Sequence, residues 1–222
     1  MTTINLSMYF EGPFRAGTGI AGHGVDEVVD LDHVVTETAV KGILRSAARI
    51  LLPSTSSPEG GDGALDSAAA VNGDSPLIKH VFGELGNEAS PWNFMVQASE
   101  RIAHMGVRAN VRIGDDGSVK PGALLMKEEV WMNTQDNPVK VVITSRRNLD
   151  GKDLKDHCAL LRLSALLVDK IGQKKSRGMG WVSMSVDDYT GNSELFQTDL
   201  NTLNKVRCAS TGDNQGTEDA EQ

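Results

Sequence analysis

Residues 153–186 contain a long apolar segment, a glycine-rich basic loop and an alternating segment in direct succession. Residues 153–171 are apolar on most faces, which predicts a largely buried helix. Val182, Met184 and Val186 alternate with polar residues, which is typical of a half-buried strand. The loop must therefore lead the chain from a buried helix straight into a sheet.

The loop itself, GQKKSRGMG at residues 172–180, combines three glycines with three cations. Glycine lets a backbone come very close to a ligand, and exposed N–H groups and cationic side chains both favour phosphate oxygens. We therefore predict a phosphate-binding loop, although a solvated connection with a glycine helix cap would read the same way. The candidate residues are Gly172, Lys174, Lys175, Ser176, Arg177, Gly178 and Gly180.

The net charge of −8 is unevenly distributed along the 222 residues. Residues 53–76 and residues 208–222 each carry four acidic residues and no Lys or Arg, so the remainder holds 22 residues of each sign. The composition of both acidic segments is typical of a flexible chain. We expect one folded domain over residues 1–205, with a flexible insertion at 53–76 and a disordered tail at 206–222. Local basic stripes, and hence nucleic acid as a partner, remain compatible with this distribution.

The chain has no apolar run long enough to cross a bilayer, and no secretory signal opens it. Its two cysteines, Cys158 and Cys208, stand far apart and match neither a metal-binding spacing nor a disulfide framework. We therefore expect a cytoplasmic protein.

A first helix is predicted for residues 38–52, where apolar residues follow helical spacing and Pro53 ends the pattern. Lys41, Arg45 and Arg49 stand at i, i+4 and i+8, so they share one flank of that helix. No acidic residue alternates with them, which leaves them available for an anion. The alternative is an ordinary solvated face.

The remaining pattern predicts strands, a short helix and a hairpin with a basic arm at Arg108. These are the strands at residues 3–11, 92–97 and 138–145, the helix at 77–82, and the hairpin at 105–132 with a turn at Asp115-Asp116-Gly117. No pattern is evident from residue 191 onward. The order predicts an α+β fold, in which two helices cover one face of an antiparallel sheet.

Three other motifs were considered. Gly17-x-Gly19-x-x-Gly22 has the form of a dinucleotide fingerprint, but it leads into β-prone residues rather than a helix. Residues 172–180 do not form a phosphate-loop NTPase motif, because Arg177 occupies the second glycine position. Residues 177–184 nearly match the signature strand of an RNA-recognition motif, with methionine in place of two aromatics, and would give a binding module without catalysis.

Several of these stretches, in this order, resemble the RAMP (repeat-associated mysterious protein) superfamily of CRISPR effector subunits. They are TAVKGILRSAARIL, FGELG, RANVRIGDDGSVKPGALLMKEEV and GQKKSRGMGWV, and the likeness extends over residues 3–187. The nearest likeness is to the backbone subunit of type III complexes, although ETAV at residues 37–40 departs from the family's usual sequence.

The resemblance implies a modified ferredoxin-like (RNA-recognition-motif-like) fold with a β-hairpin thumb, here at about residues 105–126. It also implies a filament of such subunits along a CRISPR RNA, with other effector subunits as partners. Lys41, Gly42 and Arg45 match the family's RNA-contacting helix motif, and the glycine loop matches a second contact. We add Arg49 and Arg108 as candidate RNA-binding residues because they extend the basic stripes.

In the type III backbone subunit, one loop aspartate is needed to cut target RNA, and Asp26 stands in that position. The resemblance implies attack by the neighbouring ribose 2′-hydroxyl with the help of a divalent metal such as Mg²⁺. An inert acid in a turn is the alternative, and the chain would then be a non-catalytic, capping or structural subunit. Some members process precursor RNA with a histidine, for which His23 and His33 are the candidates.

Overall fold

The computed structural model describes residues 1–22, 24–53, 73–86, 88–97, 102–149, 151–173 and 178–212. The elements are, in order, β1 (Thr3–Phe10), α1 (Glu37–Leu51), α3 (Pro76–Phe82), β2 (Trp92–Gln97), β3 (Ile102–Asn110), β4 (Leu125–Met132), β5 (Val139–Ser145), α4 (Gly151–Leu166), β6 (Val182–Val186), the 3-10 turn η2 (Asp187–Tyr189) and α5 (Ser193–Gly212).

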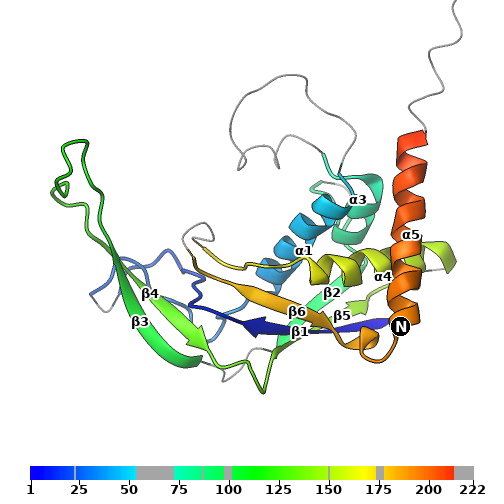
Figure 1. Cartoon of the computed structure of the whole chain (residues 1–222), viewed down its shortest axis with the longest axis horizontal. Coiled ribbons are helices and arrows are strands. Elements are labelled where there is room, and N and C mark those ends of the chain that lie inside the picture. Colours follow the sequence, from blue (N-terminus) through cyan, green and yellow to red (C-terminus); the bar gives the residue numbers. More distant parts are fainter. Residues whose placement is uncertain are drawn as a thin grey trace, which may run out of the picture.

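Four strands form one sheet in the order β2-β5-β1-β6, and every neighbouring pair is antiparallel. The central strands β1 and β5 pair with Leu6 opposite Val141. With α1 and α4 as the connecting helices, this is the ferredoxin-like arrangement, so the predicted α+β fold is confirmed. Figure 1 shows both helices on the same face of the sheet.

The core lies between that face and the helices. Alternation in β1 turns its apolar side chains, including Ile4, Leu6 and Met8, toward the helices, where they are fully buried. Burying each such side chain stabilises the fold by about 1.5–3 kcal/mol, because its apolar surface is removed from water. The helix α1 begins where Thr36 accepts a hydrogen bond from the N–H of Ala39, at 3.1 Å.

The strands β3 and β4 form a separate two-stranded sheet, inserted between β2 and β5, that projects from the body as a thumb (Figure 1). Its tip turns where predicted: the N–H of Gly114 donates to the carbonyl of Ser118 at 2.8 Å, and Gly117 adopts a φ of 78°. The thumb is confirmed, and its paired strands reach from Ile102 to Met132, beyond the predicted bounds of 105–126.

The end of the second long helix was predicted wrongly. The helix α4 ends at Leu166, whereas residues up to 171 were expected to be helical. Beyond it the chain is extended and pairs with the approach to β6, because Ile171 donates to the carbonyl of Gly180 at 2.8 Å and Val182 donates to that of Asp169 at 2.9 Å. Val168 and Ile171 are apolar because they are buried, not because they are helical.

The helix α5 was not predicted, since residues from 191 onward show no clear period. It packs against α4, and Asp199 holds it there by accepting hydrogen bonds from Arg162 at 3.2 Å and from Tyr189 at 2.7 Å. The tail predicted from residue 206 is therefore helical as far as Gly212. Residues 213–222 and most of the predicted insertion, residues 54–72, lie outside the described residues.

Candidate nucleic-acid interface

Asp26 is exposed and lies against the start of β4 in the thumb, where Met126 pairs with Ala109. Its N–H donates to the carbonyl of Met126 at 2.8 Å, and its carboxylate Oδ2 accepts from the N–H of Met126 at 2.6 Å. The neighbouring Glu27 forms a parallel bridge with Lys127, and its carbonyl accepts from Glu128 at 3.1 Å. The Asp26 segment is therefore a short additional strand on the edge of β4.

The second carboxylate oxygen of Asp26, Oδ1, has no hydrogen-bond partner among the residues that the structure describes. No group of three His, Cys, Asp or Glu side chains within that part of the chain is placed to hold a metal ion. Mg²⁺, however, is commonly held by one or two carboxylates and completed by substrate phosphates and water. A single exposed carboxylate oxygen fits that mode, so the metal stays a prediction with Asp26 as its protein ligand.

Glu27 points the other way, into the protein, and is 6% exposed. Its carboxylate pairs with the ammonium of Lys127 and accepts from Nε2 of Gln173 at 3.2 Å. Hydrogen bonding to Lys127 holds the pKa of Glu27 below its ordinary value, against burial, which raises it. One carboxylate thereby connects the thumb, the Asp26 segment and Gln173 of the predicted phosphate-binding loop.

Arg15 lies beside this group and is 1% exposed, yet none of its three guanidinium nitrogens has a hydrogen-bond partner among the described residues. Burial lowers the pKa of Arg15, and the charges of Glu27 and Glu129 oppose that shift. Arg108 donates to Glu129 at 2.7 Å, so this predicted RNA-binding cation is already ion-paired within the thumb.

Two glycines of the predicted phosphate-binding loop are required by the protein's own packing. At Gly180, with a φ of 72°, a Cβ would clash with the carbonyl of Ile171, and at Gly172, with a φ of 85°, it would clash with Phe14 and the carbonyl of Arg15. The protein's own packing is therefore sufficient to explain both glycines, and their contact with RNA stays a prediction. Gly178 is exposed with open space around it, whereas Lys174, Lys175, Ser176 and Arg177 lie outside the described residues.

The basic flank of α1 was expected to lack acidic partners, but Asp74 pairs with two of its arginines. Asp74, whose side chain is 3% exposed, accepts from Nε of Arg45 at 2.7 Å and from Nε of Arg49 at 2.5 Å. The sequence analysis assigned Asp74 to the flexible insertion, so this partner was missed. Among the cations of the stripe, Lys41 has no such ion pair within the described part of the chain, and Gly42 is exposed with open space around it.

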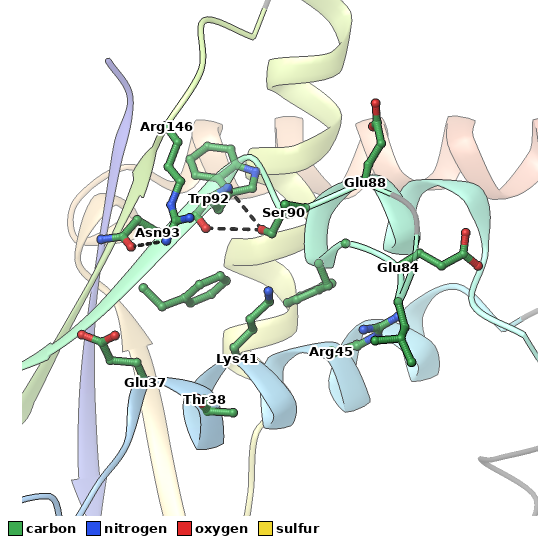
Figure 2. A pocket seen from close by; sticks show the side chains of 15 residues that line it. Glu37, Thr38, Lys41, Arg45, Glu84, Glu88, Ser90, Trp92, Asn93 and Arg146 are labelled. Atoms are coloured by element: carbon green, nitrogen blue, oxygen red, sulfur yellow. Dashed lines mark hydrogen bonds between the residues drawn. The ribbon is translucent and has the colours of Figure 1, made fainter.

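Lys41 and Arg45 also line a cavity of about 460 Å³ between α1, the end of α3 and the start of β2. Figure 2 shows the Lys41 side chain pointing into this cavity, with Arg146 and Asn93 across from it. Burial lowers the pKa of Lys41, and the charges of Arg45 and Arg146 lower it further. Lys41 and Arg146 make the part of the cavity around Lys41 positive, which would attract an anion. The lining also includes three acids, Glu37, Glu84 and Glu88.

The nearly matching RNA-recognition signature at residues 177–184 leads into β6, which is an edge strand. In that reading its aromatics should lie on a central strand, so this free-standing binding module is not supported. The face of β1 and β5 away from the helices carries Tyr9 as its aromatic side chain, together with polar residues such as Asn5 and Lys140.

The predicted site residues fall into two groups. Asp26, Arg108 and Gly172 lie near the cluster of Glu27, Lys127 and Gln173, whereas Lys41 and Arg45 face the cavity beside β2. Arg146, Glu27 and Lys127 were not singled out from the sequence. A signal existed for Glu27 alone, as the acid adjacent to Asp26 in an alternating segment.

The fold and the site define a ferredoxin-like protein with a thumb hairpin inserted before the second central strand. The model of the RAMP superfamily matches residues 9–183, and the chain belongs to this superfamily. A search of curated proteins found no match. No helix of the described residues is long and apolar enough to span a membrane.

Two solved structures are similar to this chain at low sequence identity. One is a chain in the cryo-EM structure of a type III-B Cmr-β in the apo state, with 11% identity, a TM-score of 0.54, and coverage of 83% of this chain and 97% of that chain. The other is a chain of a type IV-B CRISPR complex, with 12% identity, a TM-score of 0.49, and coverage of 83% and 90%.

Proposed function

We propose that this chain is a CRISPR RNA-binding backbone subunit of a type III effector complex, and that it cleaves target RNA through Asp26. The observation that carries the proposal is the exposed Asp26 carboxylate, hydrogen-bonded to β4 of the thumb in a RAMP fold. The similar chain in a type III-B Cmr-β supports the choice of complex. The chain would act in the cytoplasm, in contact with other effector subunits and with copies of itself.

The guide RNA would be gripped through its phosphates, without reading most bases. Lys41 and Arg146 offer cations in the cavity beside β2, and Lys174, Lys175 and Arg177 offer three more before β6. Cations on phosphate release counterions, so affinity from this source is independent of sequence and strongly dependent on salt. The thumb, which projects from the body, would insert between nucleotides.

In cleavage, the chain's own contribution is to hold the Asp26 carboxylate in a defined place. The hydrogen bond from Met126 occupies Oδ2, which leaves the exposed Oδ1 for one of two roles: to accept the proton of the attacking 2′-hydroxyl, or to hold a divalent ion that would stabilise negative charge on the phosphate. In either case the 2′-oxygen bonds to the neighbouring phosphorus, the bond from phosphorus to the 5′-oxygen breaks, and the leaving oxygen takes a proton from water. If Asp26 has no such role, the chain is a non-catalytic RAMP subunit that binds RNA through the same surfaces.

RNA binding is tested by measuring affinity for guide RNAs of unrelated sequence over a range of salt concentrations. We expect little dependence on sequence and a steep loss of affinity with salt. Replacing Lys174, Lys175 and Arg177 together by glutamine should make the slope of log affinity against log salt shallower by about two, at roughly 0.7 per phosphate contact. A flat salt response of the unchanged protein would contradict RNA binding.

Catalysis is tested in the assembled complex with Asp26→Ala. Guide RNA binding should persist, while target cleavage should fall by about 10²–10⁴-fold, the usual contribution of a positioned acid–base group. Asp32→Ala is the matched control, because Asp32 is an exposed acid of the same loop. Cleavage that survives Asp26→Ala would leave the non-catalytic alternative.

A further inference from the structure

The Asp26 segment is attached to the thumb by few main-chain hydrogen bonds. Along it the side chains alternate, with Val25 buried, Asp26 exposed and Glu27 buried. Because alternation has a period of two, a slip of one residue along β4 would turn Asp26 inward and Glu27 outward. A short edge segment of this kind needs something besides its backbone to fix the register.

The side chains of Glu27 and Lys127 provide such a fixed point. They face each other across the parallel bridge, and their side chains are 8% and 16% exposed. The best-attested role of a buried ion pair is to specify register, since a slipped arrangement leaves a buried charge without its partner. Nε2 of Gln173 donates to the same carboxylate from the other side.

The protein is also built to leave space for this carboxylate. A Cβ placed on Gly17 would overlap Oε1 of Glu27 and would lie 3.0 Å from Nε2 of Gln173. Gly17 also forms an isolated antiparallel β-bridge with Val29, two residues after Glu27 in the chain. Gly17, the first glycine of the apparent dinucleotide fingerprint, is therefore explained by the space that the Glu27 side chain needs.

We propose that Glu27 is a positioning residue, which through Lys127 fixes the register of the Asp26 segment on β4 and so sets where the Asp26 carboxylate stands relative to the thumb. Gly17 leaves room for the Glu27 carboxylate, and Gln173 donates a hydrogen bond to it. The catalytic part of this inference rests on the proposed cleavage function. The register itself is a property of the protein without RNA, and it can be measured without activity.

The first measurement is amide hydrogen exchange on the full chain. Lys127→Met keeps the apolar stem and removes the charge, whereas Lys127→Arg keeps the cation. We expect the amides of Asp26 and Glu128 to exchange about tenfold faster in Lys127→Met, because a hydrogen bond to a charged group, which is stronger than one between neutral groups, is lost beside them. The amides of β1 and β5 should be unaffected, and Lys127→Arg should resemble the unchanged protein. Unaltered protection in Lys127→Met would overturn the proposal.

The second measurement is single-turnover cleavage in the assembled complex. Lys127→Met and Gly17→Ala should lower the cleavage rate on the order of 10²-fold, as expected for a misplaced catalytic group, while guide RNA affinity is retained. Lys127→Arg should restore most of the rate. Equal rates for Lys127→Met and the unchanged protein would refute positioning. If amides exchange faster in Lys127→Met but Asp26→Ala cleaves at the full rate, the role of Glu27 and Lys127 in fixing the register stands and catalysis by Asp26 is refuted.

Discussion

Asp74 and Arg49 are separated by 25 residues, yet Oδ1 of the acid lies 2.5 Å from Nε of the base. Arg45 binds the other oxygen of the same carboxylate. The end of an acidic segment is thereby fixed to a helix flank that would otherwise be unpaired and basic.

Asp74→Asn should lower stability and strengthen RNA binding together. Removing a buried charge with two partners should cost about 1–2 kcal/mol, because both guanidinium groups remain partly exposed to water. The freed arginines should make the salt slope of RNA affinity steeper by about one. Thermal unfolding and salt titration measure the two effects, with the exposed Asp136→Asn as the control. An unchanged salt slope would show that this flank does not face RNA.

Stability should fall in acid because of His157. Its Nδ1 accepts a hydrogen bond from Nε1 of Trp92 at 3.1 Å, and burial lowers the pKa of His157, although the charge of Asp153 opposes the shift. As the pH falls below the ordinary value of 6.5, the unfolded chain gains a proton that the folded chain resists. The free energy of unfolding should then decrease by up to about 1.4 kcal/mol per pH unit.

The difference between His157→Gln and the unchanged protein isolates this contribution. Glutamine can still accept from Trp92 but does not titrate, so the variant should lose less stability between pH 7 and pH 5. His104→Gln, at an exposed position, should keep the original pH dependence. The prediction would be contradicted if the His157→Gln variant and the unchanged protein lost the same free energy of unfolding between pH 7 and pH 5.

The two glycines near the end of the basic loop should respond differently to alanine. Gly178 and Gly180 have nearly the same φ, 73° and 72°, but Gly178 has open space while a Cβ on Gly180 would clash with Ile171. Backbone strain alone should cost about 1 kcal/mol in Gly178→Ala, and strain with the clash should cost about 3 kcal/mol in Gly180→Ala. Melting temperatures should fall by about 3 °C and roughly 10 °C. Similar losses would argue against the packing explanation for Gly180.

Removal of divalent cations should separate cleavage from binding. With a chelator present, target cleavage should stop and guide RNA affinity should be retained, because the grip depends on cationic side chains. Adding Mg²⁺ should restore cleavage in the unchanged protein and not in Asp26→Ala. Cleavage that continues in the chelator would remove the metal from the proposed mechanism.

Much of the fold follows from local patterns. The bounds of β1, β2 and α1 were predicted within a residue or so, because alternation and a helical period are visible in short windows. The end of α4 was missed because Leu167, Val168 and Ile171 continue the apolar character of the helix, and apolar residues in short runs do not distinguish a helix from a buried extended segment. The helix α5 was missed because its stability depends on contacts with α4.

The candidate site was less accessible from the chain alone. Asp26 was identified through family resemblance, among several acids that look equivalent in the loop. Its partner Met126 lies 100 residues away. The ion pair of Glu27 with Lys127 spans the same separation, and no local pattern encodes it.

Short-range periodicity thus defined the strands, the first helix and the thumb, because the side chains concerned are neighbours along the chain. Folding in three dimensions assigned the roles of the charges: which arginines Asp74 neutralises, which glycines face the protein's own backbone, and which acid of the loop is buried. Those roles depend on distances between residues remote in the sequence, and on the low dielectric in which an unpaired charge is costly.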